Sequence, residues 1–214
     1  MSHVSAAEGN RPFVIGVAGG SGSGKTTVVD LLRTSRFGDG LSVLPHDAYY
    51  LNREHMPDAV RDLENWDHPA ALDHGLYLQH LDELLAGRAV EAPVYDFAEH
   101  RRSEQTRPVL PRRVLVLEGI LLFAVPEICE RIDLRVFVET PADLRVVRRT
   151  VRDLRERGRT LEFAMRQYET TVRPMHQQFV EPSRQQAHLI IPWIAHNPPA
   201  VELLLARIAQ VLGG

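Results

Sequence analysis

Short apolar runs alternate with longer, partly charged segments along this chain. The strand-like runs lie at residues 13–18, 41–45, 114–119, 134–139 and 188–193. Three of them are rich in β-branched side chains, which favour strands. Nearly continuous apolar strands are typical of sheets that are covered on both faces, so these runs predict a five-stranded parallel sheet.

The segments between the runs carry apolar residues at helical spacing. Helices are expected at residues 24–34, 75–87, 141–158, 160–180 and 197–214. Glycines end the second and the third, prolines open the last, and Pro174 is expected to interrupt the fourth. Strands that alternate with helices predict an α/β fold of the doubly wound kind, with helices on both faces of the sheet.

One stretch fits this alternation badly. Residues 88–112 contain two short extended runs around polar residues, which predict an inserted β-hairpin flap over a site. With 214 residues, 44% of them hydrophobic, the chain suits one compact domain with a sizeable core. We therefore expect a disordered N-terminal tail at residues 1–11 and a single domain at residues 12–214 that carries the flap.

Composition narrows the class of partners. A formal charge of −3 and a pI near 6.4 give no overall basic field, so we expect no binding to nucleic acid or to a membrane surface. Cys129 is the only cysteine and cannot form an internal disulfide. No signal-like segment opens the sequence, and no run approaches about 18 apolar residues. The chain is expected to be soluble and cytoplasmic.

A phosphate-binding motif follows the first run. Residues 19–26, GGSGSGKT, match the pattern G-x-x-x-x-G-K-[ST] between a strand and a helix. Glycines let successive N–H groups turn toward phosphate oxygens, and the helix adds its N-terminal dipole. Lys25 would reach the terminal phosphates, and the Thr26 hydroxyl would ligate Mg²⁺. The expected nucleotide-binding residues are Gly19, Gly20, Ser21, Gly22, Ser23, Gly24, Lys25, Thr26 and Thr27.

Two acidic residues are expected at the same edge of the sheet. Glu118 falls near the end of the run at 114–119, and Asp47 follows the run at 41–45. Ligands of open α/β sheets bind at the carboxyl ends of strands, so both acids would face the phosphate motif. Glu118 is a candidate metal ligand, and Asp47 is a candidate metal ligand and base. Either acid alone could instead start a turn or cap a helix.

Aromatic, acidic and histidine side chains between residues 50 and 100 suit a nucleoside. Rings can stack on a base, a carboxylate can bind ribose hydroxyls, and a histidine can read a base edge. Taken singly, such aromatics are more often core residues than ligand contacts. The acceptor-binding candidates are Tyr50, Trp66, Asp67, Tyr95, Phe97 and His100.

Seven arginines lie within 15 residues near the third expected helix. On that helix, one basic stripe is formed by positions 145, 148, 149, 152 and 155. Arg157 and Arg159 flank Gly158, where the helix can end and hinge. A solvated charged face is the plain interpretation. A mobile lid at about 145–175 would instead use guanidinium groups to bind triphosphate, with Arg152 and Arg157 as catalytic candidates.

The order of these motifs resembles the uridine-cytidine kinase family of P-loop kinases. The resemblance runs from about residue 12 to the C-terminus and rests on GVAGGSGSGKTT, HDAYY, NWDHPAALD, PVYDF, VLEGIL, RRTVRDLRERGRTLE and QY. It implies a P-loop NTPase fold and transfer of phosphate from ATP or GTP to the 5′-hydroxyl of uridine or cytidine. It also implies Mg²⁺ as cofactor, a role in pyrimidine salvage, and a homotetramer.

The resemblance also gives individual residues a role. It matches Asp47 to the base and metal-shell aspartate, and Asp67 to the carboxylate that binds the ribose hydroxyls. Tyr95 and His100 match the pair that reads the base. The other matches are Arg149 as a substrate contact, Gln167 near the ribose, and Arg152, Arg157 and Arg159 as lid arginines over the phosphates.

The loop after the last run departs from the family. Residues 192–198, PWIAHNP, replace the usual arginine-glycine turn beside the donor purine, so the choice between ATP and GTP stays open. His196 is the donor-contact candidate in this loop. A neutral His100 imidazole can donate and accept, so we expect both uridine and cytidine as acceptors. The alternatives are a phosphoribulokinase-like or pantothenate kinase-like enzyme, or a nucleotide-binding pseudo-kinase.

Overall fold

The computed structural model describes residues 11–53, 56–57 and 64–213, so the predicted tail at 1–11 lies outside the described residues except for Arg11. Five parallel strands form the main sheet in the order β2-β5-β1-β6-β7. Each predicted apolar run is one of these strands, so the parallel sheet is confirmed. The strands are β1 (Phe13–Ala18), β2 (Leu41–Pro45), β5 (Val114–Glu118), β6 (Leu134–Glu139) and β7 (Leu189–Pro192).

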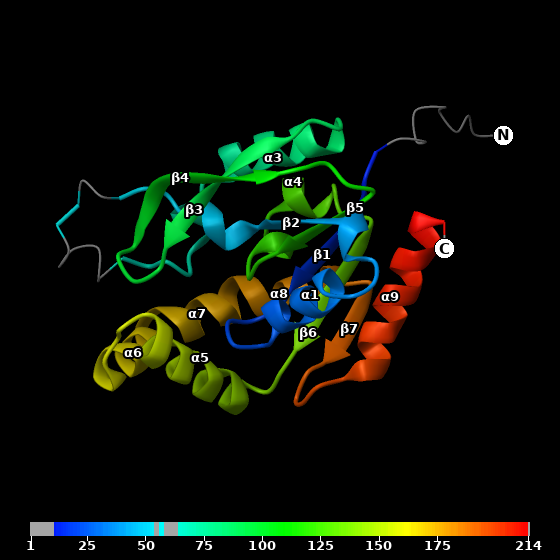
Figure 1. Cartoon of the computed structure of the whole chain (residues 1–214). Helices are drawn as coiled ribbons and strands as arrows, with labels where there is room; N and C mark the ends of the chain where they lie inside the picture. Colours follow the sequence, from blue (N-terminus) through cyan, green and yellow to red (C-terminus); the bar gives the residue numbers. More distant parts are fainter. Residues whose placement is uncertain (1–10, 54–55, 58–63, 214) are drawn as a thin grey trace.

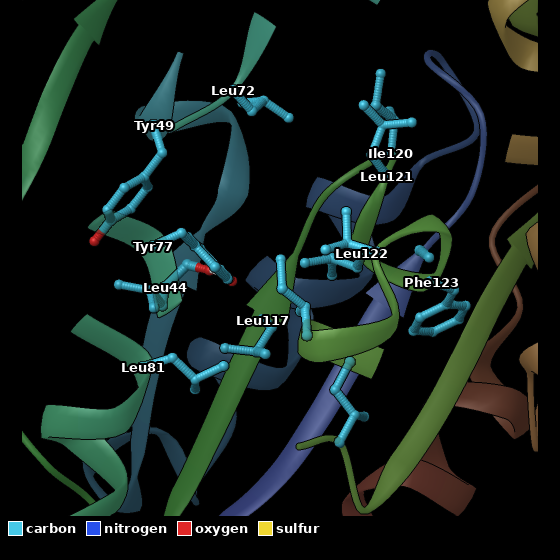
Figure 2. Packing of buried hydrophobic residues seen from close by; sticks show 14 of the residues in the cluster. Leu44, Tyr49, Leu72, Tyr77, Leu81, Leu117, Ile120, Leu121, Leu122 and Phe123 are labelled. Atoms are coloured by element: carbon cyan, nitrogen blue, oxygen red, sulfur yellow. Dashed lines mark hydrogen bonds between the residues drawn. The ribbon is translucent and has the colours of Figure 1, made fainter. Parts of the chain in front are cut away.

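Helices cover both faces of this sheet (Figure 1). Alternate residues of a strand point to opposite faces, so Ile15 packs with α1 (Lys25–Arg33) and α9 (Pro198–Leu212). Val14 belongs to the cluster on the other face, which includes the buried side of α3 (His74–Leu85). Figure 2 shows part of that second cluster. Burial on both faces explains why the strands are almost uninterruptedly apolar.

The expected interruption of the fourth helix at Pro174 is wrong. Helical backbone runs from α6 (Leu161–Gln167) through α7 (Arg173–Met175) to α8 (Glu181–Ser183), joined by π-helical turns. Pro174 lies in the first turn of α7, directly after one of these wider turns. A proline lacks an N–H and crowds the preceding helical turn, and the wider backbone accommodates both defects.

The remaining helical elements are short, apart from α5. The π-helical turns are Tyr168–Val172 and His176–Val180, and 3₁₀ turns occur at Gly38–Gly40, His46–Tyr49, Pro69–Ala71, Leu122–Ala124 and Arg184–Gln186. The other α-helices are α4 (Pro126–Cys129) and α5 (Ala142–Glu156). No helix in the described part of the chain is long and apolar enough to cross a membrane.

A separate antiparallel ribbon, β3 (Val90–Asp96) and β4 (Arg101–Val109), occupies most of the predicted flap. Arg102 ties this ribbon to the chain that follows β2. Its guanidinium donates to the carbonyl oxygens of Tyr50 at 2.8 Å and Tyr49 at 3.2 Å. It also pairs with the carboxylate of Asp73 at 3.1 Å. The ribbon is therefore fixed beside the turn that carries Asp47.

Candidate active site

The phosphate motif forms a loop between β1 and α1. Gly22 and Gly24 have φ values of +78° and +97°, a left-handed backbone that favours glycine. A Cβ on Gly24 would lie 2.4 Å from the indole of Trp193, so this position also needs glycine for space. Since α1 begins at Lys25, its first N–H groups face the loop. This arrangement suits an anion such as a phosphate.

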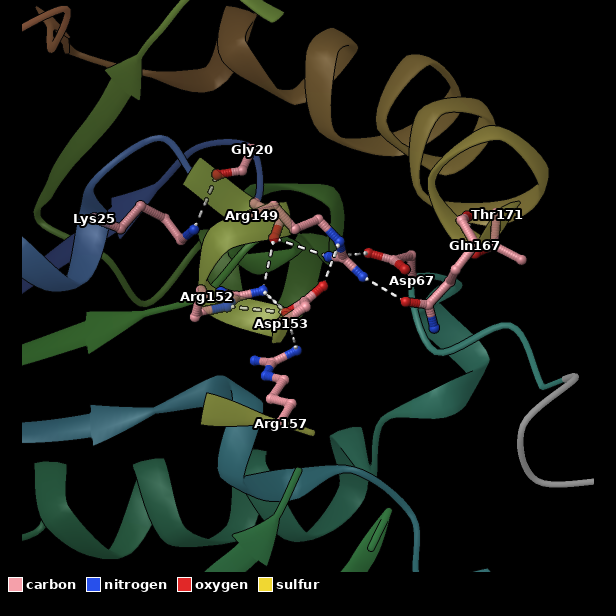
Figure 3. A network of polar contacts seen from close by, with 10 residues as sticks. Gly20, Lys25, Asp67, Arg149, Arg152, Asp153, Arg157, Gln167 and Thr171 are labelled. Atoms are coloured by element: carbon pink, nitrogen blue, oxygen red, sulfur yellow. Dashed lines mark hydrogen bonds and ion pairs between the residues drawn. The ribbon is translucent and has the colours of Figure 1, made fainter. Parts of the chain in front are cut away.

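Lys25, the only lysine of the chain, lies at the start of α1. Its side chain is buried, and Nζ donates to the carbonyl oxygen of Gly20 at 3.2 Å (Figure 3). Burial lowers the pKa of Lys25, while the carboxylates of Glu118 and Asp47 act to raise it. The ammonium is therefore held by a carbonyl dipole and two negative charges, next to the backbone that would receive phosphate.

Oxygen ligands of the kind that Mg²⁺ prefers gather beside Lys25. Thr26 Oγ1 donates to Glu118 Oε1 at 2.7 Å, and Asp47 Oδ1 is buried with no hydrogen-bond partner in the described part of the chain. Burial raises the pKa of Glu118, Lys25 lowers it and Asp47 raises it. The described residues form no group of three or more His, Cys, Asp or Glu that could hold a metal by itself. The residues present fit a magnesium ion whose remaining ligands would be phosphate and water oxygens.

A pocket beside Asp47 brings the predicted acceptor residues together. Ser21 of the phosphate loop also lines it, so the pocket and the loop are continuous. Tyr95, Phe97 and His100 come from the ribbon and its turn, whereas Gln167 ends α6. The predicted residues that line the pocket are Asp47, Tyr50, Trp66, Asp67, Tyr95, Phe97, His100, Arg149, Arg152, Arg157, Arg159 and Gln167.

Aromatic rings form one wall of this pocket. Trp66 and His100 stack with their ring planes 4° apart and their centroids 4.7 Å apart. The rings of Tyr50 and Tyr95 lie 5.2 Å apart, beside this stack. His100 is buried and has a φ of +50°, which is uncommon for a residue other than glycine. Flat, buried rings of this kind suit a planar heterocycle.

An ion-paired carboxylate also lines the pocket. Asp67 is buried, and Arg149 Nη1 lies 3.8 Å from Asp67 Oδ1. Burial raises the pKa of Asp67, while the Arg149 charge lowers it. Arg149 also donates to Ser21 Oγ at 2.9 Å and to Gln167 Oε1 at 3.0 Å. One arginine therefore contacts the phosphate loop, the acidic residue and α6.

Two residues of the site were missed by the sequence interpretation. Asp153 is 2% exposed and pairs with three arginines of the predicted lid. His176 Nε2 lies 3.0 Å from Arg145 Nη2, and burial lowers the pKa of His176 to about 4. A neutral imidazole there accepts a hydrogen bond from Arg145, which packs against Gly20 of the phosphate loop. For Asp153, the signal in the sequence was its position four residues after Arg149, a spacing that brings two side chains together on a helix.

Some predicted donor contacts lie away from the phosphate loop. Arg159 donates to the carbonyl oxygen of Ala98 in the turn of the ribbon at 3.4 Å. The guanidinium of Arg157 lies over the ring of Phe97 at 4.6 Å. His196 is exposed, and its ring lies 5.7 Å from that of Trp193. Their expected contact with a nucleotide stays a prediction, as does that of the exposed Thr27.

Comparison with known proteins places the chain among small-molecule kinases. The model of the phosphoribulokinase / uridine kinase family matches residues 14–198. The chain is similar to uridine kinases of Bacillus cytotoxicus and Bacillus cereus. Each is 46% identical over 203 residues, which covers 95% of this chain and 96% of the relative.

Solved structures share the fold at lower identity. One is described as a fructose transport system kinase from Silicibacter sp. TM1040. It has a TM-score of 0.72 and 23% identity, and the match covers 87% of this chain and 92% of the other. A second is D-glycerate 3-kinase from Cryptococcus neoformans, with a TM-score of 0.58, 19% identity and 79% of each chain covered. At these identities the likeness concerns the fold alone.

Proposed function

The chain belongs to the phosphoribulokinase / uridine kinase family, and from this premise we propose that it phosphorylates the 5′-hydroxyl of uridine and cytidine. Membership makes it a P-loop kinase. The proposed donor is ATP or GTP with Mg²⁺, and the proposed products are UMP and CMP, as in pyrimidine salvage. The observation that carries the proposal is the aromatic and acidic pocket that opens onto the phosphate loop at Asp47.

In this proposal the pocket binds the nucleoside. The aromatic wall of Tyr50, Trp66 and Tyr95 takes the base, and His100 reads its edge, since a neutral imidazole can both donate and accept. Asp67 accepts hydrogen bonds from the ribose hydroxyls. Gln167 is linked to Asp67 by Arg149, which contacts both side chains. Uracil and cytosine present opposite donors and acceptors at one edge, so both nucleosides are accepted.

Asp47 is the proposed base. Its Oδ1 is buried and has no hydrogen-bond partner in the described structure, so it can accept the proton of the 5′-hydroxyl. The same carboxylate orients that hydroxyl toward the phosphate loop. Phosphoryl transfer depends mainly on such positioning and on charge stabilisation, because little covalent chemistry is required of the protein.

Cationic groups are proposed to stabilise the transferred phosphoryl group. Lys25 binds the terminal phosphates, and Arg152 and Arg157 neutralise the charge that develops during transfer. Thr26, Asp47 and Glu118 would hold Mg²⁺, which supplies further charge neutralisation on the phosphates. The contacts of Arg157 and Arg159 with the ribbon support a lid that excludes water from the acceptor pocket.

Two further features of the proposal concern the assembly and the donor. From the family we expect a homo-oligomer. We also expect the loop after β7 to lie at the donor purine, with His196 as the contact in place of the family's usual arginine-glycine turn. The choice between ATP and GTP follows from that contact.

Release of nucleoside diphosphate from Mg·ATP or Mg·GTP tests the proposal. The acceptors are uridine, cytidine, adenosine, ribulose 5-phosphate and pantothenate. Uridine and cytidine are expected to give turnover at least about a hundredfold above the others. Preferential turnover of ribulose 5-phosphate or pantothenate would identify another small-alcohol kinase, and nucleotide binding without any turnover would identify a pseudo-kinase. Either result contradicts the proposal.

The base is tested by Asp47→Asn, which is expected to lower kcat by about 100-fold or more, the range of general-base catalysis. Asp82→Asn is the matched control. Asp82 is an exposed acid of α3 whose ion pair, in the described part of the chain, is with Arg131 outside the site, so its loss leaves turnover unchanged. Turnover by Asp47→Asn within a few-fold of wild type removes Asp47 from the role of base.

A further inference from the structure

One buried carboxylate is shared by three arginines. Asp153 Oδ2 lies 3.3 Å from Arg149 Nε, and Asp153 Oδ1 lies 3.0 Å from Arg152 Nη2 and 3.4 Å from Arg157 Nη1 (Figure 3). Every ion pair of the Asp153 side chain is with one of these arginines, among the described residues. We call these four residues the Asp153 cluster.

Like charges so close together repel, and burial makes the repulsion stronger. Arg149 is 7% exposed, and the side chains of Arg152 and Arg157 are 31% and 20% exposed. Burial lowers the pKa of Arg157 to about 10, Arg152 lowers it as well, and Asp153 acts to raise it. Asp153 is thus the one anion paired with all three of these buried or half-buried cations among the described residues.

Besides Asp153, the three arginines contact different parts of the site. Arg149 donates to Ser21 Oγ at 2.9 Å and lies 3.8 Å from Asp67. Arg152 Nη2 lies 3.5 Å from the same serine oxygen. Arg157 covers the ring of Phe97 in the ribbon. The Asp153 cluster therefore joins the phosphate loop, the acceptor pocket and the flap through one carboxylate.

The backbone adds a further fixed point at the same residue. The N–H of Arg159 donates to the carbonyl oxygen of Asp153 at 3.1 Å, just after α5 ends. Gly158 has a φ of +64°, which lets the chain turn back there. Both the side chain and the backbone of Asp153 thus hold the arginine-bearing end of α5.

We propose that Asp153 is a positioning residue, which holds the guanidinium groups of Arg149, Arg152 and Arg157 in the array that phosphoryl transfer requires. This inference rests on the proposed function. Asp153 also lines the acceptor pocket, but its carboxylate is paired with the three arginines and acts through them, while in the proposed reaction the arginines bind the phosphates. When phosphate arrives, the guanidinium groups already stand in place, so little rearrangement is needed at the moment of transfer.

The test is Asp153→Asn, which keeps the shape of the side chain and removes its charge. We expect kcat to fall about ten- to a hundredfold, with KM for donor and nucleoside changed less than about threefold, because misplaced arginines act in the transition state. The matched control is Asp82→Asn. Asp82 pairs with Arg131 at 2.7 Å outside the site, so kcat stays at the wild-type value. Equal kcat values for Asp153→Asn and wild type overturn the inference.

A double-mutant cycle separates positioning from a general loss of structure. If Asp153 acts through Arg157, then Arg157→Gln costs much less in the Asp153→Asn background than in wild type. Additive effects contradict the inference. Urea unfolding of each variant checks the fold. If Asp153→Asn does not fold, Asp153→Glu takes its place: it keeps the charge but shifts the arginines, so kcat falls, and an unchanged kcat overturns the inference.

The inference about Asp153 can be tested even if the proposed function is wrong. Absence of nucleoside turnover by the wild-type enzyme rejects the proposed substrates. The same variants are then compared by their slow hydrolysis of Mg·ATP, since Arg149 and Arg152 lie at Ser21 of the phosphate loop whatever the acceptor is. A loss of about tenfold for Asp153→Asn is expected there too, and hydrolysis equal to wild type overturns the inference.

Discussion

At the scale of single residues, burial and opposite charge compete throughout the site. Burial lowers the pKa of Lys25 and raises those of Glu118 and Asp67. Each shift is resisted by a partner: Glu118 for Lys25, Lys25 for Glu118, and Arg149 for Asp67. The charged forms therefore depend on one another, and a change in one residue alters the others.

The first prediction concerns Lys25→Arg. The guanidinium is planar and wider than an ammonium, so it does not fit beside the Gly20 carbonyl and the two carboxylates. We expect kcat at least about a hundredfold below wild type, measured by nucleoside diphosphate release, with the urea unfolding midpoint unchanged. Lys25→Met serves as the comparison, since it loses the charge as well. Near-normal turnover of Lys25→Arg would mean that positive charge alone is sufficient.

Residues in local motifs could be predicted from the sequence, whereas residues that depend on tertiary burial could not. The phosphate loop, Asp47 and Glu118 follow from strand ends and motif spacing. An Asp among arginines at helical spacing is typical of a solvated helix face, so the sequence alone assigns Asp153 no role in the site. Only the packing of α5 against the site makes it 2% exposed.

At the scale of elements, α5 has its charged side toward the protein. Arg145 and Arg149 are buried, whereas Val147, Val151 and Leu154 are 58%, 40% and 40% exposed. Apolar residues at helical spacing usually mark the buried face of a helix, so on α5 they would predict burial of the wrong face. The arginine stripe was predicted from the sequence as a phosphate-binding lid. Its burial against the phosphate loop and acceptor pocket supports that interpretation.

The segment after α5 contains a backbone feature, the π-helical turns, that sequence patterns do not predict. Gln167, Val172, His176 and Val180 all face inward, at spacings of five, four and four residues. Spacings of four keep Val172, His176 and Val180 on one side of a regular α-helix, whereas the spacing of five between Gln167 and Val172 requires the wider π-helical turn Tyr168–Val172. Proline predicted a break at this point, and nothing in the local sequence distinguishes a break from a wider turn.

The second prediction concerns the tie between the ribbon and the acceptor pocket. Arg102→Gln removes the ion pair with Asp73 and weakens the hold on the carbonyls of Tyr49 and Tyr50. We expect KM for the nucleoside to rise about tenfold, with kcat lowered less, because the aromatic wall loses its fixed position. Arg101→Gln, the exposed neighbour on β4, is the control and keeps the wild-type KM. An unchanged KM in Arg102→Gln would show that the ribbon holds its place without this residue.

At the scale of the whole molecule, two histidines link stability to pH, the buried His46 and the half-buried His176. Burial lowers the pKa of His46 to about 3 and that of His176 to about 4, against 6.5 for a free side chain. Below about pH 6.5 the unfolded chain therefore binds protons that the folded chain does not, and stability falls as pH falls. Asp67 and Glu118, with raised pKa values, act in the opposite direction at the acid end of this range.

The third prediction follows from that linkage. Between about pH 6 and 4.5, each of these histidines contributes up to about a tenfold change in the unfolding equilibrium constant per pH unit. His176→Asn removes one contribution and should flatten the slope accordingly, since an amide oxygen can still accept from Arg145. Urea unfolding at a series of pH values measures the slope. The same substitution at the exposed His196 is the control, and parallel slopes for His176→Asn and wild type would contradict the linkage.

The two tryptophans of the chain lie at different parts of the site. Trp66 stacks on His100 in the acceptor pocket, and Trp193 packs against Gly24 of the phosphate loop. Their natural emission therefore offers two built-in optical reporters. With Trp193 replaced by Phe, the remaining signal would follow the arrival of a nucleoside. With Trp66 replaced by Phe, it would follow the phosphate loop, so the order of substrate binding could be watched without any added dye.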